Sequence, residues 1–296
     1  MRTPPPIDAP AAGNLFALWR IGRMCLTGAG QIMLQKNAAT GAVFIAGIAW
    51  NSLASALGAV LGLGVATFTA LWLRYGPLKT ENGIYGFNGA LVGIAAFQFL
   101  VPGISAVLLA TVGAAASTVA MRWMMRRFLL PAFTAPFVLM TWLLLGGGWV
   151  LGAMRSGSAI AGSDLHFAVC VLQGIGQVMF QGSVVSGAVF LAGIACCSWR
   201  AAARAVAGSV IGCAVAVVAQ LPAAQISAGL FGYNSALVAL ALRAWWPAAL
   251  GAALTVPIAV ALQKLGIAPL TAPFVLATWA IAAAWRRAAR AERQVK

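Results

Sequence analysis

The six residues Gly30-Gln31-Ile32-Met33-Leu34-Gln35 occur twice in this chain with small changes. The second copy, Gly176-Gln177-Val178-Met179-Phe180-Gln181, follows 146 residues later. The next block recurs at the same offset, because residues 41–49 read GAVFIAGIA and residues 187–195 read GAVFLAGIA. Each copy sets two polar amides around an apolar run in a chain with few polar groups. We interpret the two copies as the halves of one pore.

The composition indicates a membrane protein. Of the 296 residues, 62% are hydrophobic and 8% are charged, whereas a soluble domain carries about 25% charged residues. Lys, Arg, Asp and Glu are absent from long stretches, and a membrane-spanning helix needs about 20 apolar residues. These stretches are 37–73, 82–121, 128–154, 165–199, 205–242, 244–263 and 265–285. The chain is therefore predicted to be an all-α polytopic membrane protein.

Two further motifs extend the repeat over nearly the whole chain. Residues 83–91 (GIYGFNGAL) return as 229–237 (GLFGYNSAL), again at offset 146. Residues 133–142 (FTAPFVLMTW) return as 270–279 (LTAPFVLATW), at offset 137. The predicted organisation is a polar leader, a first repeat, a second repeat and a basic cytoplasmic tail, with the boundaries 1–14, 15–155, 156–286 and 287–296.

The basic residues indicate that the two repeats are inverted. Arg74 and Lys79 lie in the loop 74–81, whereas its counterpart 220–227 has no basic residue. Lys and Arg stay on the cytoplasmic side, so equivalent loops lie on opposite sides. Inverted repeats need an odd number of spans, and five fit each half, with both termini cytoplasmic and the inner (cell) membrane as location. The predicted spans are 36–53, 54–73, 87–101, 103–121 and 133–154, then 182–199, 205–221, 230–245, 246–263 and 269–285.

A re-entrant half-helix is also predicted in each half, around the central pore. Residues 15–34 are apolar but are interrupted by Arg20 and Arg23, which favours a helix entering from the interface or a re-entrant half-helix over a clean span. The stretch 83–91 is the alternative, because the span that follows it is short.

Several classes of function are excluded. The acidic residues are Asp8, Glu81, Asp164 and Glu292, and His166 is the one histidine. No acid pair, nucleophile–base set or metal cluster can be assembled, so we expect no enzyme, metal or cofactor. The net charge of +15 does not indicate nucleic-acid binding, because the basic residues are dispersed. The five cysteines form no CxxC pair, and we interpret them as apolar filling.

The side chains available to a pore are neutral and polar. They are amides, hydroxyls and aromatic rings: Gln31, Gln177, Thr134, Thr271, Phe87, Phe180 and Tyr233. Without fixed charge nothing offsets the dehydration of an ion, so the permeant is expected to be uncharged but polar. A small planar molecule rich in N–H donors, such as urea, fits. Interhelical hydrogen bonding alone could also explain the glutamines, although their recurrence at equivalent places favours pore lining, and packing could explain the aromatic residues, Leu91 and Leu237.

The three repeated motifs resemble those of the urea transporter family. They are Gly-Gln-x-Met-x-Gln, Gly-(Phe/Tyr)-Asn-(Gly/Ser)-Ala-Leu-Val and (Phe/Leu)-Thr-Ala-Pro-Phe-Val-Leu, and each occurs in both halves between Gly28 and Ala284. The resemblance implies two inverted halves of five spans plus a re-entrant helix. It also implies a homotrimer with one pore per protomer and passive, facilitated diffusion of urea.

The resemblance also implies roles for individual residues. The outer sites correspond to Gln31 and Gln177, with Leu34 and Phe180 beside them and Phe87 and Tyr233 as walls. The central constriction corresponds to Ile32, Val178, Leu91, Leu237, Thr134 and Thr271. Leu34 stands where family members commonly have Phe, so one mouth is expected to lack a full aromatic clamp.

Two functions remain open at this point. The first is a passive channel for urea and close amide analogues. The second is a gradient-coupled secondary transporter of a small neutral amide or amine. The absence of carboxylates deep in the apolar runs favours the channel, because coupled transport usually uses intramembrane carboxylates.

Overall fold

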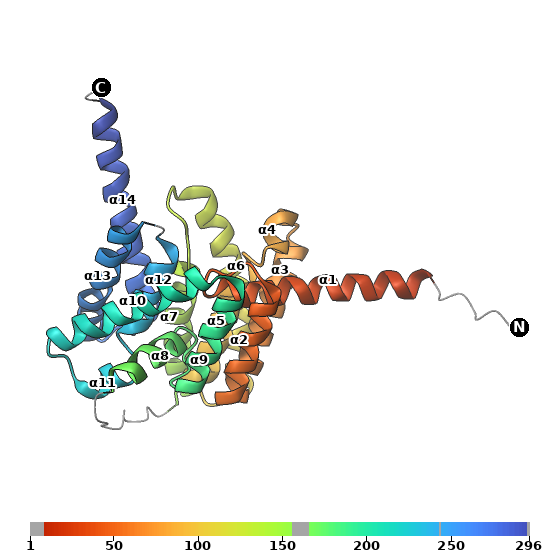
Figure 1. Cartoon of the computed structure of the whole chain (residues 1–296). Helices are drawn as coiled ribbons and strands as arrows, with labels where there is room; N and C mark the ends of the chain where they lie inside the picture. Colours follow the sequence, from red (N-terminus) through yellow and green to blue (C-terminus); the bar gives the residue numbers. More distant parts are fainter. Residues whose placement is uncertain (1–8, 156–165, 243, 295–296) are drawn as a thin grey trace, which may run out of the picture.

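The described part of the computed structural model comprises residues 9–155, 166–242 and 244–294, and its regular structure is helical (Figure 1). The first half contains α1 (Ala9–Gln31), α2 (Ala38–Asn51), α3 (Leu53–Trp72), α4 (Pro77–Glu81), α5 (Gly86–Phe99), α6 (Ile104–Arg127) and α7 (Ala135–Val150). The second half contains α8 (Phe167–Gln177), α9 (Val184–Cys197), α10 (Trp199–Val218), α11 (Ala223–Ser227), α12 (Gly232–Ala241), α13 (Trp245–Lys264) and α14 (Ala272–Gln294). The expected all-α fold is confirmed.

Within the described residues each half contains seven helices in the same order, and each predicted span coincides with one helix. The largest differences lie at the ends. α10 begins at Trp199, six residues before the predicted start, because the Ser198 side chain accepts a hydrogen bond from the Ala201 N–H and caps the helix ahead of Arg200 and Arg204. α14 continues through the predicted boundary at residue 286 to Gln294. α1 begins at Ala9, inside the predicted leader, of which residues 1–8 lie outside the described part. The predicted boundary between the repeats, at residue 155, borders 156–165, which also lies outside the described part.

Four of the described helices, α3, α6, α10 and α13, are long and apolar enough to cross a membrane. Others are shorter, such as α5 with 14 residues and α12 with 10 residues. Large apolar side chains point outward, and Phe68 on α3 and Leu143 on α7 are each exposed over about two-thirds of their surface. An exterior of this kind suits lipid and does not suit water.

The packing of α3 on α5 depends on glycine. A Cβ atom placed on Gly62 would lie 2.0 Å from the carbonyl oxygen of Gly89, and one on Gly58 would lie 2.4 Å from that of Gly93. The two backbones therefore touch along both helices, as small residues permit in membranes. Gly58 and Gly62 are therefore contact positions between the two helices.

Equivalent residues of the two halves contact each other where α2 meets α9. Phe44 and Phe190, which are equivalent at offset 146, stack edge to face with ring centres 5.4 Å apart. The Thr40 hydroxyl donates to the Gly193 carbonyl (2.9 Å), and the Ser186 hydroxyl donates to the Gly47 carbonyl (2.8 Å). Thr40 and Ser186 are equivalent, as are Gly47 and Gly193, so the contact is reciprocal.

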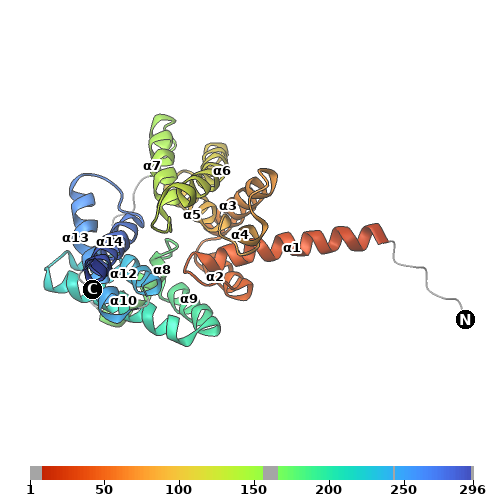
Figure 2. The same cartoon turned by 90° about the horizontal axis from the view of Figure 1, so that it is seen from above.

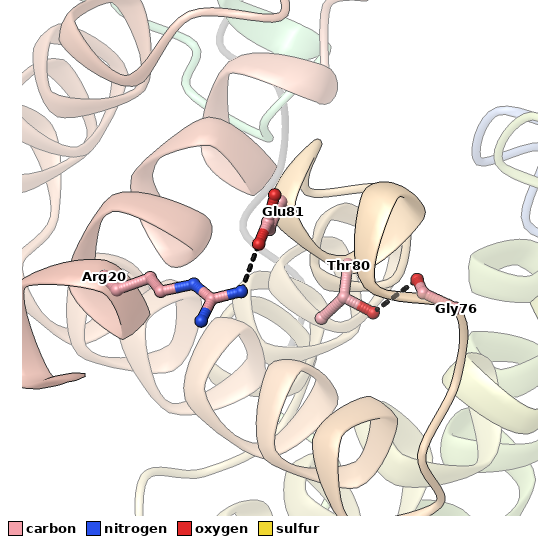
Figure 3. A network of polar contacts seen from close by, with 4 residues as sticks. All are labelled: Arg20, Gly76, Thr80 and Glu81. Atoms are coloured by element: carbon pink, nitrogen blue, oxygen red, sulfur yellow. Dashed lines mark hydrogen bonds and ion pairs between the residues drawn. The ribbon is translucent and has the colours of Figure 1, made fainter.

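α1 extends away from the other helices toward its N-terminal end (Figures 1 and 2). It is joined to α4 by an ion pair between Arg20 and Glu81, drawn in Figure 3 beside the Thr80 hydroxyl, which donates to the Gly76 carbonyl. Arg23 lies over the Trp19 ring at 5.6 Å. The two arginines that interrupt the apolar stretch 15–34 therefore both have partners near the exposed part of α1.

The interpretation of all five cysteines as apolar filling is wrong for two of them. Cys170 on α8 and Cys213 on α10 form a disulfide bond that is buried in a small apolar cluster. The sequence could not indicate this pair, because the partners lie 43 residues apart and meet through the packing of two helices. Cys25, Cys196 and Cys197 are free thiols.

Candidate functional site

A cavity of about 330 Å³ lies between the two halves, and we call it the Gln31 cavity. Six of the twelve predicted site residues line it: Gln31, Ile32, Leu34, Phe87, Thr134 and Leu237. It is also lined by seven residues that were not in the predicted set: Ile84, Met121, Met125, Pro131, Ala132, Phe133 and Phe274. Because Leu237 and Phe274 belong to the second half, the cavity combines both repeats.

The other six predicted residues lie outside this lining. Leu91, Val178 and Thr271 are buried, with at most 2% of their surface exposed. Gln177, Phe180 and Tyr233 are half-buried, at positions equivalent to Gln31, Leu34 and Phe87. The structure thus gathers the residues of one predicted mouth around a cavity.

Each repeated Gly-Gln-x-Met-x-Gln motif forms the same helix end. The Leu34 N–H donates to the Gln31 carbonyl (3.0 Å) and the Gln35 N–H to the Gly30 carbonyl (3.0 Å), which is the Schellman pattern. Phe180 and Gln181 repeat it with Gln177 and Gly176. Leu34 and Phe180 have φ of 61° and 59°, a left-handed conformation that costs about 1–2 kcal/mol for residues with a side chain. Non-glycine residues held this way often occur at functional sites.

The two glutamines use their amide groups in one common way. The Gln31 Nε2 donates to the Asn82 carbonyl (2.9 Å), and the Gln177 Nε2 donates to the Ala228 carbonyl (3.0 Å). In the described part of the chain neither Oε1 accepts a hydrogen bond from a protein donor. Interhelical bonding therefore accounts for the N–H group, while the Gln31 carbonyl oxygen stays available as an acceptor at the cavity.

Thr134 and Thr271 meet where the halves meet. The Thr271 hydroxyl donates to the Thr134 hydroxyl over 2.7 Å, and both residues are almost fully buried. They are equivalent residues, at offset 137, so the pair joins the same position of the two repeats. Thr134 also lines the Gln31 cavity, so one residue of this hydroxyl pair borders the cavity.

Two buried asparagines explain why these hydroxyls are free for each other. Thr134 is the N-cap residue of α7, yet its hydroxyl caps no backbone N–H. The Asn88 Oδ1 accepts from the Phe137 N–H instead (3.1 Å), and the Asn88 Nδ2 donates to the Phe133 carbonyl (3.3 Å). Proline at position 136 has no N–H to cap. The asparagine thus replaces the capping function that an N-terminal threonine usually has.

The second half repeats this arrangement. The Asn234 Oδ1 accepts from the Phe274 N–H (3.1 Å), and its Nδ2 donates to the Leu270 carbonyl (3.1 Å). The Tyr233 hydroxyl also donates to the Leu270 carbonyl (2.7 Å). The prediction missed Asn88 and Asn234 as site residues, although both lie inside a repeated motif where buried polar side chains are costly.

Two tryptophans hold the segments before the threonines, each from the other half. The Trp142 Nε1 of α7 donates to the Ala268 carbonyl (2.8 Å), three residues before Thr271. The Trp279 Nε1 of α14 donates to the Pro131 carbonyl (2.8 Å), three residues before Thr134. Each threonine is therefore positioned by an asparagine of its own half and a tryptophan of the other.

We predict a moderate effect when the two indole N–H groups are removed and the rings are kept. In Trp142→Phe/Trp279→Phe each lost hydrogen bond costs about 1 kcal/mol, which corresponds to roughly five-fold in an equilibrium. The transport rate in proteoliposomes and the apparent melting temperature should both fall. Trp149→Phe, at an exposed position of α7, is the matched control and should change neither; equal losses in the control would contradict the positioning role.

The two mouths differ by a complementary exchange of aromatic residues. Beside Leu34 the Gln31 cavity has Phe133 and Phe274, with ring centres 5.1 Å apart. In the other half Phe180 stands in place of Leu34 and Leu270 in place of Phe133, and Phe180 packs on Phe137 at 6.2 Å and on Phe99 at 5.5 Å. The first mouth thus has an aromatic side chain at residue 133 and none at residue 34. Phe133 was not among the predicted site residues.

Leu34→Phe should make the first mouth resemble the second. The backbone permits the change, because Phe180 has the same left-handed φ. The added ring should fill part of the Gln31 cavity and lower the transport of N-methylurea relative to urea by about ten-fold, near the lower limit for one extra methylene in a tight pocket. Phe180→Leu is the reciprocal variant and should raise that ratio. Unchanged ratios in both variants would show that these residues do not select the permeant.

The arrangement can bind a small neutral molecule that donates hydrogen bonds. Its available acceptors are the Gln31 Oε1 and the Thr134 hydroxyl, which is paired with Thr271, and its walls are apolar and aromatic. In the described part no group of three or more His, Cys, Asp or Glu residues could hold a metal ion. Glu81, the acidic residue whose side chain is described, is paired with Arg20.

Comparisons with known proteins point to a single family of similar sequences. The sequence model of the urea transporter family matches residues 23–286. Similar curated proteins include urea transporter 1 of Capra hircus (27% identical over 241 residues), of Rattus norvegicus (28%) and of Mus musculus (27%). Each alignment covers 73% of this chain and 61% of the relative, so the chain spans less than two-thirds of those proteins.

Proposed function

This chain belongs to the urea transporter family and is a multi-pass membrane protein, and on that premise we propose that it is a passive channel for urea and close amide analogues. The observation that carries the proposal is the hydroxyl pair of Thr134 and Thr271, of which Thr134 lines the Gln31 cavity. A molecule entering past Gln31 meets acceptor oxygens at the mouth and at the centre, with apolar walls between them. Urea has four N–H donors in one plane and fits such a set.

The proposed route consists of two outer sites and one centre. The outer sites are Gln31, Leu34 and Phe87 in one mouth and Gln177, Phe180 and Tyr233 in the other. The centre is formed by Ile32, Leu91, Val178 and Leu237 around Thr134 and Thr271. In the route each N–H group of urea exchanges water for a protein oxygen, which offsets the cost of dehydration.

We further propose that the halves are inverted repeats with five spans each and a re-entrant helix, formed by α1 and α8. The reciprocal contacts of Thr40 with Gly193 and of Ser186 with Gly47 support a two-fold relation, because such an axis exchanges equivalent partners. The places of α4 and α11, near opposite ends of the molecule in Figure 1, support the inversion. The Cys170–Cys213 disulfide adds support, because Cys213 lies about 2.5 turns from Arg204 and about 3.6 turns from Arg200 on α10 and thus toward the non-cytoplasmic end.

The proposal includes a homotrimer with one pore per protomer in the inner membrane, with both termini cytoplasmic. The exposed apolar side chains of α1, such as Phe16 and Trp19, are available for a contact between subunits. Native mass spectrometry of the detergent-solubilised protein should give the mass of three chains.

Urea uptake into proteoliposomes tests the function. We expect rapid uptake down a urea gradient that is unchanged when a proton or sodium gradient is imposed, with protein-free liposomes as the control. Uptake that requires either gradient would contradict the channel and favour the coupled transporter of a small amide or amine.

A further inference from the structure

A second cavity, which shares no lining residue with the Gln31 cavity, lies between the end of α6 and the later part of α14. It has a volume of about 430 Å³, and we call it the basic cavity. Three arginines line it, Arg127, Arg286 and Arg287, together with Phe128 and Trp279. Arg127 is in the last turn of α6, where the helix dipole favours a cation.

These arginines have no acidic partner among the residues that the structure describes, where the one ion pair joins Arg20 to Glu81. Arg286 donates one hydrogen bond, to the Leu129 carbonyl (3.1 Å), and its other N–H groups remain available. Three guanidinium groups around one cavity repel one another unless an anion binds between them. Guanidinium groups bind phosphate oxygens well, because their N–H groups form a planar fork.

An apolar cavity of about 270 Å³ adjoins the basic cavity and shares Phe128 and Trp279 with it. We call it the apolar groove; it runs between α6, α7 and α14. Trp123, Leu139 and Leu276 line it, and between 44% and 55% of the surface of each is exposed. An exposed apolar groove that begins beside a cluster of arginines is complementary to a phosphate group with an acyl chain attached to it.

We propose that the basic cavity and the apolar groove together form a binding site for an anionic phospholipid. The phosphate group lies among Arg127, Arg286 and Arg287, and one acyl chain lies along the groove past Phe128 and Trp279. Free phosphate would leave the apolar groove unfilled, and a neutral lipid would leave the arginines without an anion. The bound lipid lies against the segment 128–131, which the Trp279 and Arg286 side chains hold before Thr134.

Lipid titration of the purified protein in detergent, followed by native mass spectrometry, tests this site. The probes are phosphatidylglycerol, phosphatidylcholine of equal chain length, and inorganic phosphate. We expect the wild type to prefer phosphatidylglycerol over phosphatidylcholine. Arg127→Gln/Arg286→Gln/Arg287→Gln should weaken phosphatidylglycerol binding about five-fold per arginine and thus on the order of 100-fold in total.

A matched triple variant, Arg74→Gln/Lys79→Gln/Arg126→Gln, removes the same charge outside the cavity and should keep the preference. Leu276→Asn, in the apolar groove, should weaken phosphatidylglycerol binding and leave any binding of inorganic phosphate unchanged. The proposal is overturned if the wild type shows no preference, if both triple variants lose it equally, or if inorganic phosphate displaces the lipid. Loss of the oligomer in the cavity variant, without loss of lipid, would overturn it as well and identify this face as a contact with a second copy of the chain.

Discussion

Replacing both central threonines by valine is expected to lower urea flux on the order of 100-fold. Thr134→Val/Thr271→Val keeps the shape of both side chains and removes the two hydroxyl acceptors. A urea molecule at the centre would then lose two hydrogen bonds, together about 2–3 kcal/mol of the barrier. The measurement is stopped-flow uptake of urea into proteoliposomes that contain equal amounts of folded protein.

The fold should tolerate this double variant. The two hydroxyls are partners of each other, and replacing both partners of a buried hydrogen bond by apolar groups of similar shape is nearly neutral. Either single variant leaves one buried hydroxyl without a partner, so each single variant should be less stable than the double variant. This order of stabilities would itself confirm the direct contact.

The chain offers a matched control in Thr141 and Thr278. These residues are equivalent at offset 137, lie on α7 and α14, the two helices that the central pair directly precedes, and are buried with hydroxyls that have no hydrogen-bond partner. Thr141→Val/Thr278→Val makes the same chemical change away from the proposed route and should leave urea flux unaltered. Wild-type flux in the central double variant would show that these hydroxyls are not ligands of urea.

The sequence could predict those parts of the site that the repeat makes visible. Gln31 and Gln177, and likewise Thr134 and Thr271, are polar residues that recur at equivalent places in apolar surroundings, and this recurrence led to the prediction. The structure adds that Gln31 lines the cavity, and that the threonines contact each other. Their roles in a transport route remain predictions.

Other parts of the site depend on contacts between segments that are distant in the chain. Phe133 and Phe274 line one cavity although 141 residues separate them, so no local pattern indicates that they are neighbours. The start of α10 was missed because the charges of Arg200 and Arg204 were taken as the end of a loop, whereas the Ser198 cap places them inside the helix. The placement of the basic residues predicts which loops lie on the same side of the membrane, and this sidedness stays a prediction.

Asn88 and Asn234 were overlooked because their function is to replace a cap that the sequence assigns to threonine. A Thr-Ala-Pro motif predicts a helix start with the threonine as its N-cap. In the structure Asn88 of α5 accepts a hydrogen bond from the Phe137 N–H, and Asn234 of α12 accepts one from the Phe274 N–H. The threonine hydroxyl is then free to bond to the equivalent threonine. The sequence does not show this, because the asparagine that caps the helix comes from a distant segment.

Removing these asparagines is expected to have the second large effect. Asn88→Leu leaves the Phe137 N–H and the Phe133 carbonyl without partners in a buried place, at a cost of about 2–6 kcal/mol. The N-terminus of α7 should shift, and with it the Thr134 hydroxyl. Urea flux per folded molecule should fall about ten-fold or more, because a displaced Thr134 hydroxyl loses its hydrogen bond to urea. Flux and the apparent melting temperature are measured on the same preparation.

Loss of stability alone must be separated from loss of positioning, and Ser235→Ala does this. Ser235 is buried on α12 next to Asn234, where its hydroxyl lies 2.7 Å from the Thr255 hydroxyl and donates to the Ala252 carbonyl (2.9 Å). Its equivalent in the first half is Gly89, so transport cannot depend on a hydroxyl at this position in both halves. Ser235→Ala should therefore lower the melting temperature and keep the flux per folded molecule. If Asn88→Leu behaves in the same way as Ser235→Ala, the asparagines stabilise the fold without positioning the threonines.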